Sequence, residues 1–235
     1  MLFRDRREAG KLLAEQLSGY RSRDPVILAL PRGGVPVAFE IASALDAPLD
    51  LLLVRKIGVP SEPELALGAV VDGAMPDLVI DEQLMAALDI PQSYVESESK
   101  RQLAEIERRR RVYLGDRKPL DIKGRTAIVV DDGIATGNTM RVALRALARR
   151  SPGAVVLAIP IAPPDAIELL RPEVTDIVCL GTPSDFLAIG QFYEDFAQLR
   201  DDTVVQLLRA KAPAEEKSEA GASAPEAGGS REAGE

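Results

Sequence analysis

Short, mainly apolar runs alternate along the chain with segments whose apolar residues recur every three or four positions. The first kind predicts buried strands, and the second predicts helices with one apolar face. Strands are predicted at residues 26–30, 49–54, 128–130, 155–159 and 176–180. Helices are predicted at residues 5–18, 37–45, 140–147, 165–170 and 201–208. This alternation predicts an α/β fold with a parallel, doubly wound sheet.

Residues 57–113 interrupt this alternation. The Gly- and Pro-containing segment 57–64 predicts a loop, and the apolar runs 68–71 and 78–80 predict a small hairpin outside the main sheet. A long charged helix is predicted at residues 93–113. Two interpretations of its basic run, residues 108–111, stay open. The arginines form a solvated face together with nearby glutamates, or some of them reach phosphates in a site or a neighbouring subunit.

The apolar pattern ends near residue 210. Residues 211–235 contain Ala, Glu, Gly, Ser and Pro without a large apolar side chain. Such a segment cannot bury enough surface to offset the entropy lost on ordering. The sequence therefore predicts one domain at residues 1–210, followed by a disordered acidic tail.

Composition and charge exclude several classes of protein and of catalytic group. The 235 residues carry a net charge of −8, which disfavours binding to nucleic acid, and no apolar run is long enough to span a membrane. The N-terminus lacks the apolar region of a signal peptide, so we expect a cytoplasmic protein. The chain has no histidine and a single cysteine, Cys179. Histidine-based catalysis and internal disulfides are therefore excluded, which leaves carboxylates, Lys, Arg, backbone amides and Mg²⁺.

Residues 128–139, Ile-Val-Val-Asp-Asp-Gly-Ile-Ala-Thr-Gly-Asn-Thr, form the most informative segment. Its apolar start predicts a buried strand, and Asp131 and Asp132 then fall at the carboxyl end, where open α/β sheets bind ligands. The following turn leads into a helix whose first N–H groups attract an anion. Two carboxylates beside a phosphate-binding turn suit a sugar phosphate. The alternative is an ordinary βα turn with a helix cap, which needs only one such residue.

A second candidate anion site follows the strand at residues 26–30. The segment Pro31-Arg32-Gly33-Gly34 places two glycines and a guanidinium between that strand and a helix. Exposed amides beside an arginine bind oxygen anions. An Arg-Gly-Gly turn alone is weak evidence, but it becomes good evidence when it is paired with the 128–139 segment.

The 128–139 segment resembles the binding motif for 5-phosphoribosyl-1-pyrophosphate (PRPP) in type I phosphoribosyltransferases. The resemblance implies that fold, Mg²⁺, a homodimer, and transfer of the phosphoribosyl group from PRPP to a small nitrogenous acceptor. It assigns the ribose and 5′-phosphate to Asp131, Asp132, Gly133, Ala135, Thr136, Gly137, Asn138 and Thr139. It assigns the diphosphate to Arg32, Gly33, Gly34 and Lys56, in a loop that often has a non-proline cis peptide in this family. Metal would be held by Asp131 and Asp132 through PRPP hydroxyls or water.

The resemblance extends over residues 1–210 to an uncharacterised branch of predicted phosphoribosyltransferases. The segments 55–69 and 186–196 carry it, and we expect no fused hydrolase domain because no Gly-x-Ser-x-Gly motif occurs. Segment 58–65 is a candidate closing loop. Lys56, at the end of the predicted strand 49–54, and the aspartate pair are the candidate catalytic groups with Arg32.

The acceptor is less well indicated. Ala135 replaces the aspartate that handles a purine proton in many 6-oxopurine enzymes, which argues against that route. Candidate acceptor contacts are Ile134, Phe186, Phe192 and Tyr193. An alternative is a regulatory protein that binds PRPP or a nucleotide without turnover. A phospho-acceptor receiver domain also uses paired aspartates, but its acids come from separate strands and it lacks a Thr-Gly phosphate turn.

Overall fold

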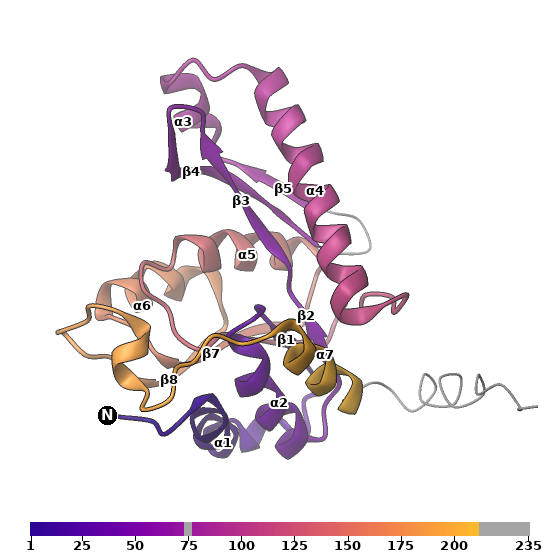
Figure 1. Ribbon diagram of the computed structural model, residues 1–235, viewed down its shortest axis with the longest axis vertical. Helices are drawn as coiled ribbons and strands as arrows, with labels where there is room; N and C mark the ends of the chain where they lie inside the picture. Colours follow the sequence, from indigo (N-terminus) through magenta and orange to yellow (C-terminus); the bar gives the residue numbers. More distant parts are fainter. Residues whose placement is uncertain (73–76, 212–235) are drawn as a thin grey trace, which may run out of the picture.

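A five-stranded parallel sheet forms the core of the computed structural model, which describes residues 1–72 and 77–211 (Figure 1). The strand order is β2-β1-β6-β7-β8. The strands are β1 (Pro25–Ala29), β2 (Leu49–Leu51), β6 (Thr126–Val130), β7 (Ala154–Ile161) and β8 (Asp176–Gly181). The predicted parallel sheet is therefore confirmed. Because β1 and β6 are neighbours, the segments that follow them emerge at the same edge.

Helices cover both faces of this sheet, with α5 and α6 on one side and α1 and α2 on the other (Figure 1). Ile27 and Ala29 of β1 pack in one apolar cluster with α1 and α2, whereas Val26 and Leu28 pack in another with α5 and α6. Successive strand side chains point to opposite faces, which explains why β1 is apolar along its whole length. The helices are α1 (Arg6–Gln16), α2 (Gly34–Leu45), α5 (Asn138–Arg149), α6 (Pro164–Leu170) and α7 (Asp201–Ala210), with 3₁₀ turns at Ser18–Tyr20, Arg171–Glu173 and Ile189–Phe192.

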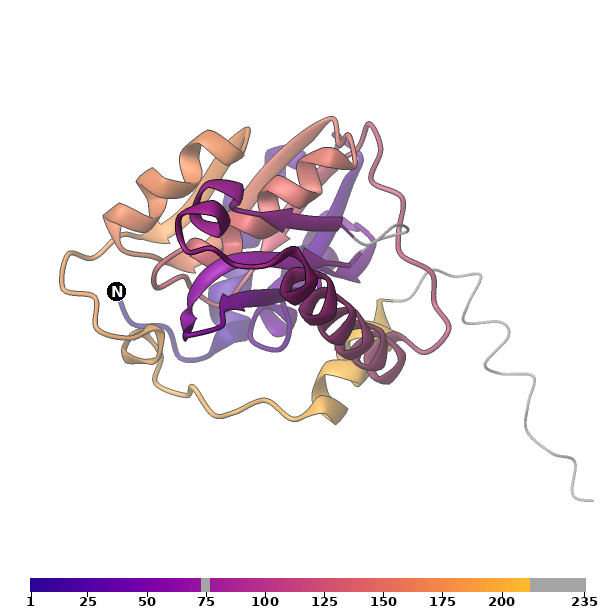
Figure 2. The ribbon, with the colours of Figure 1, turned by 90° about the horizontal axis from the view of Figure 1, so that it is seen from above.

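A second unit, which we call the hood, lies over the core and contains β3 (Val54–Val59), β4 (Glu62–Val71), β5 (Asp77–Ile80), α3 (Glu82–Ala87) and α4 (Gln92–Leu114) (Figure 2). Its three strands are antiparallel in the order β3-β4-β5. The predicted hairpin and the long charged helix are therefore confirmed. Helix α3 was not predicted, although Asp81 caps it by accepting a hydrogen bond from the Leu84 amide at 2.9 Å.

Two predictions about the hood were wrong. Residues 57–64 do not form a loop, because β3 continues to Val59 and β4 begins at Glu62. The glycine and prolines suggested a turn, but Ile57 and Val59 are buried, and the pairing register shifts at Gly58 as in a β-bulge. The predicted strand at residues 49–54 is also two elements, since β2 ends at Leu51 and β3 begins at Val54. Tertiary packing, rather than local propensity, decides both cases.

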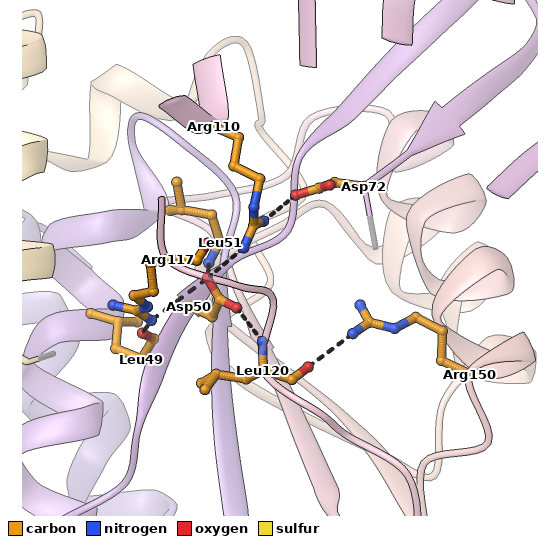
Figure 3. Close-up of polar contacts among 8 residues, drawn as sticks. All are labelled: Leu49, Asp50, Leu51, Asp72, Arg110, Arg117, Leu120 and Arg150. Carbon is orange, nitrogen blue, oxygen red and sulfur yellow. Dashed lines mark hydrogen bonds and ion pairs between the residues drawn. The ribbon is translucent and has the colours of Figure 1, made fainter. Parts of the chain in front are cut away.

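A buried ionic network ties the base of the hood to the edge of the core sheet (Figure 3). Asp50 of β2 is 2% exposed and accepts hydrogen bonds from the Leu51 and Leu120 amides, both at 2.8 Å. Two arginines face the same carboxylate, with Arg117 Nη2 3.6 Å and Arg110 Nη2 4.0 Å from Asp50 Oδ1. Arg110 of α4 also pairs with Asp72, which follows β4. The network therefore connects α4 and β4 of the hood with β2 of the core.

Three arginines of the basic run have partners within the chain. Arg110 is a structural residue, while Arg108 and Arg109 bond to Glu105 on the outer face of α4. The described residues do not include residues 212–235, which are the predicted tail except for its first residue. They also do not include Gly73, which lies between the two apolar runs of the predicted hairpin. In the ranges 1–72 and 77–211, no helix combines the length and the apolar character that a membrane crossing requires.

Candidate active site

The two candidate anion segments meet at the carboxyl edge of the sheet. Ala29 of β1 pairs with Val130 of β6, and the Leu30 amide donates to the Val130 carbonyl at 2.9 Å. The chain then turns from β1 into α2 directly beside the turn that follows β6. Ligands of open α/β sheets bind at such an edge, where neighbouring strands end and helices begin.

The Arg32 loop packs directly on the aspartate pair. A Cβ atom added to Gly33 would lie 2.2 Å from Asp132 Oδ2, and one added to Gly34 would lie 2.5 Å from the Val130 carbonyl oxygen. Any side chain at these positions would therefore collide, which explains why the loop carries two glycines. The peptide bond between Pro31 and Arg32 is cis, as the family resemblance implied.

Asp132 is held from several sides. Its carboxylate is largely buried and accepts a hydrogen bond from Arg6 Nε at 2.7 Å, in an ion pair whose two side chains are each 11% exposed. The Tyr193 hydroxyl donates to the Asp132 carbonyl at 2.6 Å. Arg6 also lies over the ring of Phe196 at 3.9 Å. Asp132 is therefore anchored by Arg6 from α1 and by Tyr193 from the segment that follows β8.

Arg6 is the site residue that the sequence did not reveal. It lies in the first turn of α1, 126 positions before its partner, and looked like one charge among several near the N-terminus. The Tyr193–Phe196 segment belongs to residues 186–196, which carry part of the family resemblance. Its contact with Asp132 depends on the packing of this segment and α1 against the end of β6, which the sequence does not show.

Asp131 differs from its neighbour, since its carboxylate is half-buried and has no cationic partner among the residues described. Its Oδ1 atom accepts a hydrogen bond from the Asp132 amide at 2.8 Å. Burial, and then the nearby charge of Asp132, raise the pKa of Asp131 well above its usual value. Asp131 is thus the member of the pair that remains available to a ligand.

The turn after the aspartates presents groups suited to a phosphate. Helix α5 begins at Asn138, after Gly137 in a left-handed conformation with φ of 76°, and no side chain caps its first amides. Four residues of the turn are exposed: Ala135, Thr136, Asn138 and Thr139. Uncapped amides together with threonine hydroxyls can bind an anion at this helix start.

Of the two predicted diphosphate cations, only Arg32 follows a core strand as expected. Arg32 belongs to the loop beside the aspartates, but its Nη1 atom lies 3.5 Å from Asp201 Oδ1 at the start of α7. Lys56 does not follow a core strand, because it lies within β3 and pairs with Ala69 of β4. That position follows from the early end of β2, which the apolar residues 51–54 concealed.

The proposed acceptor residues are mostly packed inside the protein. Ile134, Phe192 and Tyr193 are 5%, 8% and 5% exposed. The Tyr193 ring packs 5.3 Å from Phe3 and 5.1 Å from Phe196, measured between ring centroids. Their placement does not support stacking on an acceptor. Phe186 is half-buried and lies beside Leu187, which is 92% exposed.

Comparison with known proteins agrees with this geometry. Residues 78–197, which contain the whole 128–139 segment, match the family described as the phosphoribosyl transferase domain. The chain belongs to this family. The resemblance seen in the motif is therefore confirmed, and the paired aspartates and the following turn lie within the matched part of the phosphoribosyl transferase domain.

Two relatives cover nearly the whole domain. A candidate phosphoribosyl transferase of Mycobacterium tuberculosis (strain CDC 1551 / Oshkosh), MT0597, is 42% identical over 207 residues, which are 88% of this chain and 46% of that protein. The crystal structure of TT1426 from Thermus thermophilus is 44% identical, with a TM-score of 0.79, and the match covers 91% of this chain and 100% of that one. The chain thus spans about half the length of the curated relatives it matches.

Asparagine substitutions at the two aspartates of this phosphoribosyl transferase domain should change stability in opposite directions. Asp131→Asn should raise the free energy of unfolding at neutral pH, because the raised pKa means that the folded state bears a costly charge. This gain should shrink as the pH falls through the folded-state pKa of Asp131 toward the unfolded value. Asp132→Asn should lower the free energy of unfolding by about 3 kcal/mol, since Arg6 loses its charged partner. Urea denaturation at several pH values measures both effects.

Each variant serves as the control for the other, since the two changes are chemically identical and adjacent in sequence. Equal destabilisation by both substitutions would contradict the division of roles between Asp131 and Asp132.

Proposed function

We propose that the chain is an Mg²⁺-dependent phosphoribosyltransferase that transfers the 5-phosphoribosyl group of PRPP to a small nitrogenous, nucleobase-like acceptor and releases pyrophosphate. The observation that carries this proposal is the packing of the Arg32 loop on the aspartate pair. Gly33 lies so close to the Asp132 carboxylate that a methyl group would not fit between them. The proposed diphosphate and ribose sites would thus adjoin, as a single PRPP molecule requires.

Each part of PRPP has a partner in this arrangement. The amides and hydroxyls of residues 135–139 suit the 5′-phosphate. Asp131 suits the ribose hydroxyls, which would donate to its carboxylate, while Asp132 keeps the strand end in place through Arg6. The backbone of the Arg32 loop suits the diphosphate, and the Arg32 guanidinium would add a bidentate donor.

In the reaction, the bond between ribose C1 and the diphosphate oxygen breaks, and that oxygen keeps the electron pair. A bond forms between C1 and a nitrogen of the acceptor, and the proton that this nitrogen loses goes to water. Positive charge develops on the sugar ring, so Asp131 would stabilise it as well as orient the hydroxyls. The protein contributes positioning and charge, and no covalent enzyme intermediate is needed.

The donor set fits Mg²⁺, which prefers oxygen ligands and binds through one or two carboxylates together with substrate phosphates and water. Within residues 1–72 and 77–211, no cluster of three or more metal-binding side chains occurs. Asp131 would therefore hold the ion through PRPP hydroxyls or water, with Asp132 beside it. When bound, Mg²⁺ would neutralise charge on the leaving diphosphate.

A second candidate function is a protein that binds PRPP or a nucleotide without turnover. The burial of Ile134, Phe192 and Tyr193 favours it, because these predicted acceptor contacts are packed inside the protein and are not exposed to an acceptor. Transferase and sensor would share the PRPP site and differ only on the acceptor side.

Calorimetric titration with PRPP and Mg²⁺, followed by a pyrophosphate-release assay over a panel of nucleobases, tests the proposal. Heat of binding together with release is expected. Binding without release for any acceptor would favour the sensor. Absence of binding heat would contradict both the transferase and a sensor of PRPP. Thr136→Val, which removes one hydroxyl of the phosphate turn and keeps the side-chain shape, should weaken PRPP binding without affecting the fold, since Thr136 is exposed.

A further inference from the structure

The backbone of Arg32 is part of the proposed diphosphate loop, but its guanidinium is paired with an aspartate outside that loop. The loop packs on Asp132 through Gly33, whereas the Arg32 Nη1 atom lies 3.5 Å from Asp201 Oδ1. Both side chains of this ion pair are partly exposed, at 38% for Arg32 and 51% for Asp201. The guanidinium is therefore accessible to an anion from solvent, but it already has a carboxylate beside it.

Asp201 is held in this position by a second contact. The Tyr113 hydroxyl, from the last turn of α4, donates to Asp201 Oδ1 at 2.8 Å. Burial, and then this hydrogen bond, raise the pKa of Tyr113, so its hydroxyl stays protonated and keeps donating at physiological pH. Helices α4 and α7 pack side by side, which fixes the carboxylate relative to the hood helix (Figure 2).

The next aspartate provides a contrast. Asp202 is also in the first turn of α7, but it pairs with Arg200 at 3.1 Å, and both of those side chains are at least three-quarters exposed. Of these two adjacent carboxylates, Asp201 is the one bonded to Arg32. Any effect that Asp201 has on Arg32 can therefore be separated from the general effect of negative charge at the start of α7.

We propose that Asp201 competes with the diphosphate of PRPP, and with released pyrophosphate, for the Arg32 guanidinium. This inference rests on the proposed function. A guanidinium has a limited set of donors, and a carboxylate takes the same bidentate geometry as a phosphate. Binding of the diphosphate then requires Arg32 to exchange one anion for another, which lowers affinity and eases release of the product.

The test compares Asp201→Asn with Asp202→Asn. Both substitutions remove one negative charge from the same helical turn, and asparagine at position 201 can still accept the Tyr113 hydrogen bond. Calorimetric titration with magnesium pyrophosphate, and separately with PRPP, should show that Asp201→Asn lowers the Kd roughly twofold to fivefold, as expected when a partly exposed ion pair is lost. Asp202→Asn should leave the Kd close to that of the unmodified chain.

A double-mutant cycle with Arg32→Ala separates competition from a structural effect. If Asp201 acts through Arg32, the substitution at position 201 should not alter the Kd in the Arg32→Ala background. A gain that persists in this background, an unchanged Kd, or weaker binding by Asp201→Asn would each overturn the inference while leaving PRPP binding itself intact. If the unmodified chain binds neither pyrophosphate nor PRPP, the proposed function fails, and this inference fails with it.

Discussion

Replacing Arg32 by alanine should lower the rate of PRPP-dependent pyrophosphate release by about a hundredfold to a thousandfold. The physical reason is that the Arg32 guanidinium, once it has exchanged Asp201 for the diphosphate, would stabilise the charge of the leaving group most strongly in the transition state. The fold should be almost unaffected, because the ion pair with Asp201 is partly exposed and such pairs contribute at most about 1 kcal/mol. Steady-state kinetics with PRPP, together with urea denaturation, measure the two quantities separately.

Arg200→Ala is the matched control for this substitution. Arg200 is 81% exposed and pairs with Asp202 next to the same helix start, rather than with the aspartate that faces Arg32. Its removal should leave turnover unchanged. If Arg32→Ala lowered turnover only a few-fold, the backbone amides of the loop, rather than the guanidinium, would be the main ligands of the diphosphate.

The largest loss of stability is expected for Asp50→Asn, at about 3–5 kcal/mol of the free energy of unfolding. Asp50 accepts from two backbone amides and faces Arg110 and Arg117 in an almost fully buried position. Asparagine offers one acceptor oxygen, and its NH₂ group would face an N–H donor. The arginines would also lose a charged partner in a poorly solvated place. Guanidinium chloride denaturation followed by circular dichroism measures the loss.

Asp116→Asn is the control, because Asp116 is exposed in the segment that also carries Arg117 and Leu120. It should change the free energy of unfolding by less than about 0.5 kcal/mol. A similarly small effect of Asp50→Asn would mean that water enters the network and solvates the arginines, contrary to the burial of Asp50.

The core sheet was predictable because its signals are local. Residues 26–30, 128–130 and 155–159 are continuous apolar runs, as expected of strands buried on both faces, and residues 177–180 form a further apolar run in the half-buried edge strand β8. The aspartate pair was predictable for a related reason. The strand end, the two acids and the helix start follow one another without interruption, so the chain itself places them in register.

The hood was only partly predictable. Gly58 and Pro60 are typical of loops, and nothing nearby in the sequence shows that Ile57 and Val59 become buried against other parts of the hood. The same lack of local signal concealed the end of β2, since residues 51–54 are one apolar run in the sequence, whereas β2 ends at Leu51 and β3 begins at Val54. For this reason Lys56 was predicted at the end of a core strand, whereas it lies within β3 of the hood.

By itself, the sequence determined the α/β fold, the family and the strand end that carries Asp131 and Asp132, because each depends on residues close together in the chain. Only the tertiary structure decided which acid is anchored and which is available. Arg6 lies 126 positions before Asp132, and Asp201 lies 169 positions after Arg32, so no local pattern connects them. Charged side chains find such partners through the packing of whole helices, and a linear pattern of apolar and polar residues does not encode which charges will meet.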